Sequence, residues 1–89
     1  MVQDTVVIIN KLGLHLRAAA LLVQTAAAFE SEVRLRKKDV EVDAKSIMGV
    51  LGLEAAKGVQ LVVTAAGPDE KDALKAITGL VEMKFDEEE

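Results

Sequence analysis

The chain of 89 residues contains no cysteine, tryptophan or tyrosine, and only one histidine, one proline and two phenylalanines. Without cysteine it can form neither a disulfide framework nor a thiolate metal site, and a single histidine gives no basis for a dedicated zinc site. Two phenylalanines offer no platform on which nucleobases could stack, so nucleic-acid binding is disfavoured. No apolar run is long enough to span a bilayer, and we expect no membrane insertion.

Acidic residues are concentrated at the C-terminus, where Asp86, Glu87, Glu88 and Glu89 supply four of the fifteen acidic side chains. The rest of the chain has eleven acidic and eleven basic residues and therefore no net charge. This balance also argues against nucleic acid as a partner. We interpret residues 86–89 as a solvated, frayed tail on a single domain that spans residues 1–89.

One segment, residues 17–28, faintly resembles a secretory signal, because Arg17 precedes an apolar run that ends in small residues. Asp4 before the run, Gln24 within it and a preceding strand pattern argue against that interpretation. We therefore expect the protein to reside in the cytoplasm.

Hydrophobic periodicity divides the chain into four strands and three helices. The strands are predicted over residues 5–9, 32–37, 40–43 and 60–66, and the helices over residues 16–29, 47–51 and 70–84. Residues 37–39 suit a hairpin, which favours an antiparallel or mixed sheet in an α+β open sandwich of order β-α-β-β-α-β-α. The residues predicted to face the core are Ala19, Leu22, Val23, Ala26, Phe29, Val33, Leu35, Val40, Val42, Ala73, Leu74, Ile77, Leu80 and Val81.

His15 lies where the first strand pattern passes into the first helix pattern. A neutral imidazole is a nucleophile, and unpaired N–H groups at a helix start favour the negative charge of a phosphoryl group. Arg17 could add charge-assisted hydrogen bonds to that group. The simpler interpretation is a loop histidine that caps or solvates the helix start, with Arg17 as a surface charge. The residues alone leave both interpretations open.

Ser46 precedes the short predicted helix and fits its N-cap position. It could also accept a phosphoryl group, because a helix N-terminus tolerates the added negative charge. Ile47, Met48 and Leu51 cannot all face the sheet from so short a helix. They form either an exposed docking patch or a satellite of the core.

Taken together, these segments resemble the HPr family, the histidine-containing phosphocarriers of the phosphoenolpyruvate-dependent phosphotransferase system. The family's active-site pattern, Gly-apolar-His-Ala-Arg-Pro, stands here as Gly13-Leu14-His15-Leu16-Arg17-Ala18. Its regulatory segment stands as Lys45-Ser46-Ile47-Met48-Gly49-Val50, and residues 56–58 and 69–74 match further along. The resemblance thus covers nearly the whole chain. Leu16 in place of a small residue and Ala18 in place of proline bear on partner choice and transfer rate, because neither removes a reacting group.

The resemblance implies an open-faced β-sandwich of four antiparallel strands with three helices on one face. It implies that His15 accepts a phosphoryl group on Nδ1 from phosphorylated enzyme I and passes it to enzyme IIA domains, with Arg17 steadying the phosphoryl oxygens. Ser46 would be the target of an HPr kinase/phosphorylase, and a transcription regulator would be a further partner. The shared docking surface would consist of Leu16, Ala20, Ile47, Met48 and Leu51. We expect a monomeric carrier without cofactor or metal, and not an enzyme.

Two other functions compete with this one. The first is a regulatory interaction module that binds transcription regulators or enzymes, with phosphotransfer secondary or lost. The second is a small phosphatase, which is disfavoured because the chain has one histidine, no cysteine and no evident acid/base pair. Residues 10–13, 67–68 and 85–87 resemble the nitrogen-related branch of the system, whereas the Ser46 segment resembles the kinase-regulated branch. The choice between sugar uptake and regulation therefore stays open.

Overall fold

The protein folds as a single four-stranded sheet covered by helices. The computed structural model describes all 89 residues. Its elements are β1 (Val2–Val7), α1 (Leu16–Ala27), β2 (Glu32–Lys37), β3 (Val40–Asp43), α2 (Ile47–Gly52), β4 (Gln60–Ala66), α3 (Glu70–Glu82) and the 3-10 turn η1 (Lys84–Asp86). The strand order is β1-β4-β2-β3, and every neighbouring pair is antiparallel. The predicted open-faced β-sandwich and its element order are thus confirmed.

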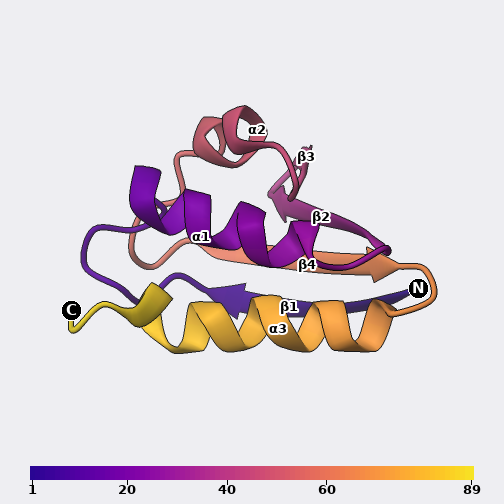
Figure 1. Ribbon diagram of the computed structural model, residues 1–89. Coiled ribbons are helices and arrows are strands. Elements are labelled where there is room, and N and C mark those ends of the chain that lie inside the picture. The colour runs from indigo at the N-terminus through magenta and orange to yellow at the C-terminus, as the bar shows by residue number, and fades with distance from the viewer.

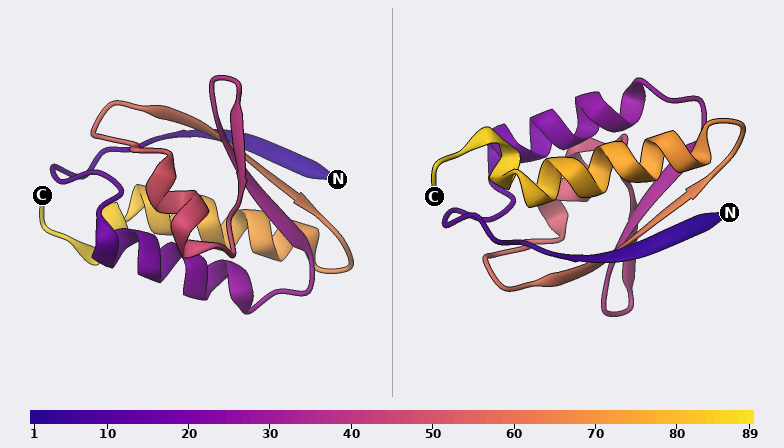
Figure 2. Two further views of the ribbon diagram at one scale, coloured as in Figure 1. Left: turned by 90° about the horizontal axis from the view of Figure 1, so that it is seen from above. Right: turned by 90° about the horizontal axis from the view of Figure 1, so that it is seen from below.

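The helices lie on one side of the sheet (Figures 1 and 2). α1 packs beside α3, which covers β1 and β4, while α2 contacts α1 and β3. β1 and α1 are joined by the loop of residues 8–15, which emerges at the same end of the molecule as the C-terminus (Figure 1). This end therefore brings together the loop, the start of α1 and the last residues of the chain.

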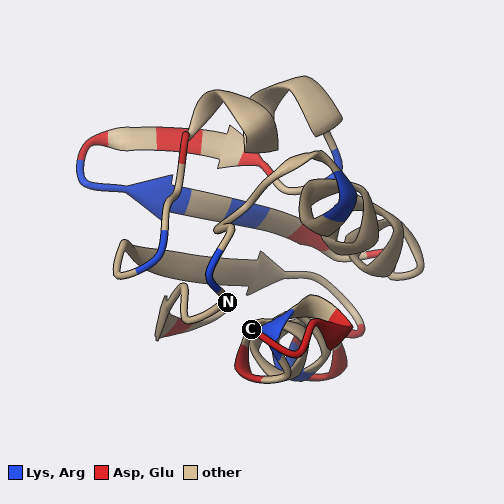
Figure 3. Cartoon of the chain, turned by 90° about the vertical axis from the view of Figure 1, so that its left-hand side faces the viewer, with Lys and Arg blue, Asp and Glu red and all other residues tan.

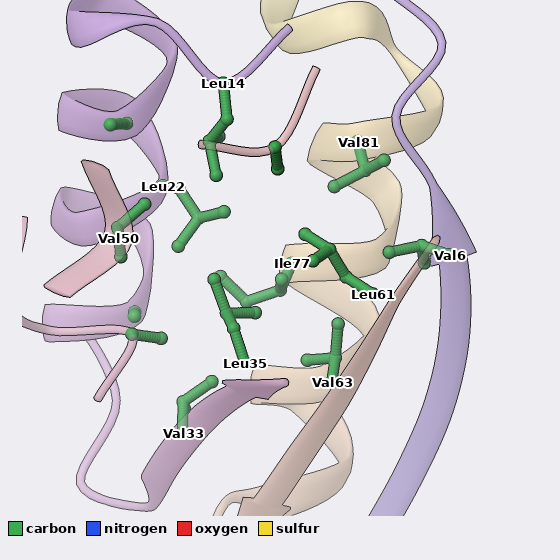
Figure 4. Close-up of a cluster of buried hydrophobic side chains, with 14 of the residues drawn as sticks. Val6, Leu14, Leu22, Val33, Leu35, Val50, Leu61, Val63, Ile77 and Val81 are labelled. Atoms are coloured by element: carbon green, nitrogen blue, oxygen red, sulfur yellow. The ribbon is translucent and has the colours of Figure 1, made fainter. Parts of the chain in front are cut away.

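The buried residues follow the two hydrophobic periodicities of the sequence, one for strands and one for helices. Residues two apart on β2 and β4, and three or four apart on α1 and α3, are buried between sheet and helices (Figure 4). The largest fully buried side chains include Leu22, Leu35, Leu61, Ile77 and Phe85. Burial of these apolar surfaces is the main stabilising term of such a fold.

Several predicted details need correction. Val40 was expected to face the core, but its side chain is 52% exposed because β3 is a short edge strand with a neighbour on one side only. Ala18 is fully buried although the predicted core omitted it. The first strand begins at Val2 and ends at Val7, α1 ends at Ala27, and α3 ends at Glu82.

Gly79 offers a test of helix propensity in this fold. It lies inside α3, and a Cβ added there meets no atom within 4 Å. Gly79→Ala should therefore raise the free energy of unfolding by about 1 kcal/mol, measured by urea denaturation. Gly67→Ala is the contrasting control and should lower the free energy of unfolding. Gly67 has φ +149°, and a Cβ added there would lie 2.7 Å from Ser31 Oγ. A Gly79→Ala protein that is no more stable than wild type would contradict this expectation.

Candidate functional site

His15 is the N-cap residue of α1. Its backbone is extended (φ −74°, ψ 178°), and its carbonyl oxygen accepts the first helical hydrogen bond from the Ala19 amide at 2.8 Å. The ring makes no capping hydrogen bond to the helix. The three amides of residues 16–18 have no carbonyl partner, because the first turn of a helix has no preceding turn to accept from it. The imidazole is 28% exposed, so it lies within reach of another molecule.

The loop before His15 is fixed by close contact with the segment that follows α2. Gly13 has φ +68°, and a Cβ there would lie 2.7 Å from the Ala55 carbonyl oxygen and 2.8 Å from Ala56 Cα. Only glycine fits this position without a shift of backbone. The amide of the buried Leu14 donates to the same Ala55 carbonyl at 2.8 Å. The backbone that leads into His15 is therefore held in place.

The C-terminal tail reaches the imidazole. Glu87 Oε2 lies 2.5 Å from His15 Nε2, and Glu87 Oε1 accepts a hydrogen bond from Asn10 Nδ2 at 2.8 Å. Asn10 is fully buried, and its Nδ2 also donates to the Gly13 carbonyl at 2.8 Å. The hydrogen bonds from Asn10 and from His15 hold the pKa of Glu87 below its ordinary value. Glu87 is therefore a carboxylate at neutral pH.

The arrangement of the tail differs from the frayed end expected from its acidic composition. Phe85 is fully buried, and Lys84, Phe85 and Asp86 adopt left-handed φ values of 58°, 54° and 62°. These residues bend the chain after α3, so that it passes the start of α1 on its way to the C-terminus (Figure 2). Beyond Glu87, the Glu89 carbonyl accepts a hydrogen bond from the Lys11 amide, and Lys11 Nζ lies 3.7 Å from the Glu89 carboxylate.

Arg17 lies in the first turn of α1 and is exposed. Its guanidinium makes no hydrogen bond or ion pair, so it is available to an anion. With Lys11 and Leu12 it lines a shallow surface depression whose other wall is formed by residues 86–89. Figure 3 shows this end of the molecule from the front, with the acidic tail in red at the C-terminus. The predicted pair of His15 and Arg17 thus lies at the edge of a mixed-charge surface.

Ser46 is the N-cap residue of α2, where the sequence predicted it. Its Oγ accepts a hydrogen bond from the Gly49 amide at 3.2 Å, and the residue is partly exposed. Lys45 Nζ donates to the Phe29 carbonyl at 2.8 Å, just beyond the far end of α1. A helix of 12 residues is about 18 Å long. The structure therefore places Ser46 well away from His15.

The five residues predicted as a docking surface are unequally exposed. Leu16 at the start of α1 and Met48 in α2 are 66% and 78% exposed, whereas Ala20, Ile47 and Leu51 are partly buried. Leu12 is also largely exposed, and the sequence pattern missed it because it lies in a loop without periodicity. In α2 only Val50 is fully buried. This short helix thus supplies both core and surface.

No helix of the structure is both long and apolar enough to cross a membrane. The described residues include no group of three or more histidine, cysteine, aspartate or glutamate side chains arranged to hold a metal ion.

Comparison with known proteins relates this geometry to a family. The model of the family described as "PTS HPr component phosphorylation site" matches residues 2–83. The chain is 47% identical over 88 residues to the phosphocarrier protein HPr of Treponema pallidum (strain Nichols), covering 99% of this chain and all of that protein. It is 46% identical over 89 residues to HPr of Neisseria meningitidis serogroup A, with full coverage of both.

A solved structure agrees with these relatives. The crystal structure of HPr-C-His from Thermoanaerobacter tengcongensis has a TM-score of 0.97 and 46% sequence identity, over the full length of both chains. Sequence and fold therefore point to the same group of proteins. The chain belongs to the HPr family of phosphocarrier proteins of the phosphotransferase system.

Proposed function

We propose that His15 accepts a phosphoryl group from phosphorylated enzyme I and that the protein passes this group to enzyme IIA domains. The observation that carries the proposal is the position of the partly exposed imidazole at the start of α1, beside three unpaired amides and an unpaired Arg17. Membership of the HPr family supports the same role. The protein then acts in the cytoplasm as a monomeric carrier whose reacting group is regenerated by each transfer.

The chemistry follows from the free nitrogen of the ring. Nε2 is engaged by Glu87, whereas Nδ1 has no partner within the protein. The lone pair of Nδ1 attacks phosphorus, and the bond between phosphorus and the donor breaks as the new P–N bond forms. The amides of the first turn of α1 are placed to donate to the phosphoryl oxygens, and Arg17 offsets their charge. Transfer to enzyme IIA is the same displacement, with Nδ1 as the leaving atom.

The two partners would dock on the same apolar surface around His15. Leu16 and Met48 are its most exposed members, and Ala20, Ile47 and Leu51 lie in the same two helices, which contact each other. A contiguous patch of exposed apolar side chains commonly marks an interaction surface. Leu16 extends into solvent, so its extra bulk enlarges this surface next to the phosphoryl acceptor.

The test is intact-mass spectrometry after incubation with phosphoenolpyruvate, Mg²⁺ and enzyme I from the same source. We expect one phosphoryl adduct that is lost when the sample is acidified, because a P–N bond is acid-labile. An adduct that survives acid would place the phosphoryl group on another kind of residue. No adduct at all would overturn the proposal in favour of a regulatory module that only binds its partners.

Ser46 is the proposed target of an HPr kinase/phosphorylase, and its phosphorylated form is the proposed ligand of a transcription regulator. Ser46 and His15 lie near opposite ends of α1, so a phosphate on Ser46 acts on docking rather than on the imidazole itself. Ser46→Asp should therefore raise the KM for phosphorylated enzyme I about 10-fold, equivalent to about 1.4 kcal/mol, and leave kcat nearly unchanged.

Ser46→Asn is the matched control for this prediction. Asparagine and aspartate are equally good N-cap residues, so the pair differs in charge and not in support of α2. Initial rates with varied enzyme I and a calorimetric Kd would measure the effect. Equal KM and Kd values for the two variants would show that charge at this position does not control docking.

A further inference from the structure

We infer that Glu87 is a positioning residue for His15, whose carboxylate keeps the ring proton on Nε2 and so leaves Nδ1 unprotonated as the phosphoryl acceptor. This inference rests on the proposed function. It adds to that function a residue 72 positions away along the chain, in a tail whose composition alone predicted a solvated end.

The contact itself dictates which nitrogen has the proton. A carboxylate can only accept hydrogen bonds, and the Glu87 Oε2 atom is 2.5 Å from Nε2. Nε2 must therefore be the donor. In a neutral imidazole the other nitrogen then has the free lone pair. The depressed pKa of Glu87, caused first by the Asn10 hydrogen bond and then by that of His15, keeps the carboxylate ionised.

Glu87 is in turn held by a buried amide. Asn10 Nδ2 donates to Glu87 Oε1 and to the Gly13 carbonyl, both at 2.8 Å. Asn10 Oδ1, by contrast, is buried without a partner. Such an unsatisfied atom is destabilising, and an apolar residue here would avoid the penalty but lose the donor that orients Glu87. The Asn10 amide thus orients the Glu87 carboxylate. Carboxylates that are hydrogen-bonded in this way commonly orient a ligating or catalytic histidine.

The same contact stabilises the product of transfer. When the lone pair of Nδ1 forms the bond to phosphorus, the electron pair of the broken bond stays with the donor. The ring retains its proton on Nε2 and becomes a phosphoimidazolium. Its positive charge then faces the Glu87 carboxylate, which is already in place before the reaction. A preorganised negative group opposite a developing positive charge lowers the barrier to the step.

The test compares Glu87→Gln with Glu88→Gln. Each variant removes one negative charge from the tail, but Glu88 makes no hydrogen bond or ion pair with another side chain. The first readout is the tautomer of His15, measured by ¹⁵N NMR of the free protein. Wild type and Glu88→Gln should show the Nε2-protonated tautomer, whereas Glu87→Gln should show a mixture of both tautomers.

The second readout is the rate of phosphorylation by phosphorylated enzyme I. Glu87→Gln should be about 10-fold slower than wild type, in the range seen when the second partner of a functional histidine is removed, and Glu88→Gln should match wild type. An unchanged tautomer in Glu87→Gln would overturn the inference. An equal or faster rate would also overturn it, and a faster one would identify the tail as a block on the ring.

The two proposals fail in different ways. The NMR measurement needs no partner protein, so it tests the role of Glu87 on the free protein. Absence of a phosphoryl adduct on wild type would count against the proposed function, whereas a tautomer that is insensitive to Glu87→Gln would count against the positioning role alone.

Discussion

His15→Ala should abolish the acid-labile phosphoryl adduct formed with phosphoenolpyruvate, Mg²⁺ and enzyme I. The substitution removes the only imidazole of the chain, and there is no cysteine to replace it as a nucleophile. Ser46 lies near the opposite end of α1, so it cannot take over the reaction with a donor docked at His15. Intact-mass spectrometry should therefore detect no adduct under conditions that convert the wild-type protein completely.

His15→Gln is the matched control for this result. Its side-chain amide can still donate to Glu87 and so retain the tail, but an amide nitrogen is not a nucleophile. We expect both variants to fold, because His15 makes no side-chain capping bond to α1 whose loss would destabilise the helix. Circular dichroism during heating would verify this. A normal adduct on either folded variant would show that the phosphoryl acceptor lies elsewhere.

The fold could be predicted from the sequence because its core residues recur at regular spacing. On β2 and β4, buried side chains alternate with exposed ones, and the predicted bounds of both strands match the structure. The hairpin between β2 and β3 closes without glycine because Lys38 adopts φ 55°. The strand order β1-β4-β2-β3 could not be read in the same way, since periodicity defines which face is buried but not which strand lies alongside.

Local sequence also sufficed for half of the candidate site. His15 and Arg17 lie in one segment at a strand-to-helix junction, so their proximity follows from the predicted elements. The contact between Asn10 and Glu87 joins residues 77 positions apart. It depends on three consecutive non-glycine residues with positive φ, a conformation that propensities disfavour. The acidic composition suggested a solvated tail over residues 86–89, and the apolar residue directly before it, Phe85, was overlooked as an anchor.

Phe85→Ala should lower the free energy of unfolding by about 3–5 kcal/mol, the usual result of truncating a fully buried phenylalanine. Small domains have only about 5–15 kcal/mol of stability, so this is a large fraction of the total. Phenylalanine and alanine are both L-residues and meet the same backbone strain at φ 54°. The substitution therefore tests the lost packing and not the backbone conformation. Urea denaturation would measure the change.

Met83→Ala is the control, because it also removes a large side chain from this segment. Met83 is 62% exposed, so its truncation should change the free energy of unfolding by no more than about 0.5 kcal/mol. Phe85→Leu, with a smaller loss, keeps the test informative if the alanine variant unfolds. If the stability of Phe85→Ala equalled that of Met83→Ala, Phe85 would not anchor the tail.

The packing of Phe85 and the contact of Glu87 with His15 should also be coupled. Phe85 lies two residues before Glu87, so its removal frees the segment that presents the carboxylate to Nε2. Phe85→Leu should consequently show part of the tautomer mixture expected for Glu87→Gln, although Glu87 itself is intact. Met83→Ala should retain the wild-type tautomer. If Phe85→Leu also retained it, the loop through Asn10 would be sufficient to hold Glu87, and the buried aromatic ring would contribute to stability alone.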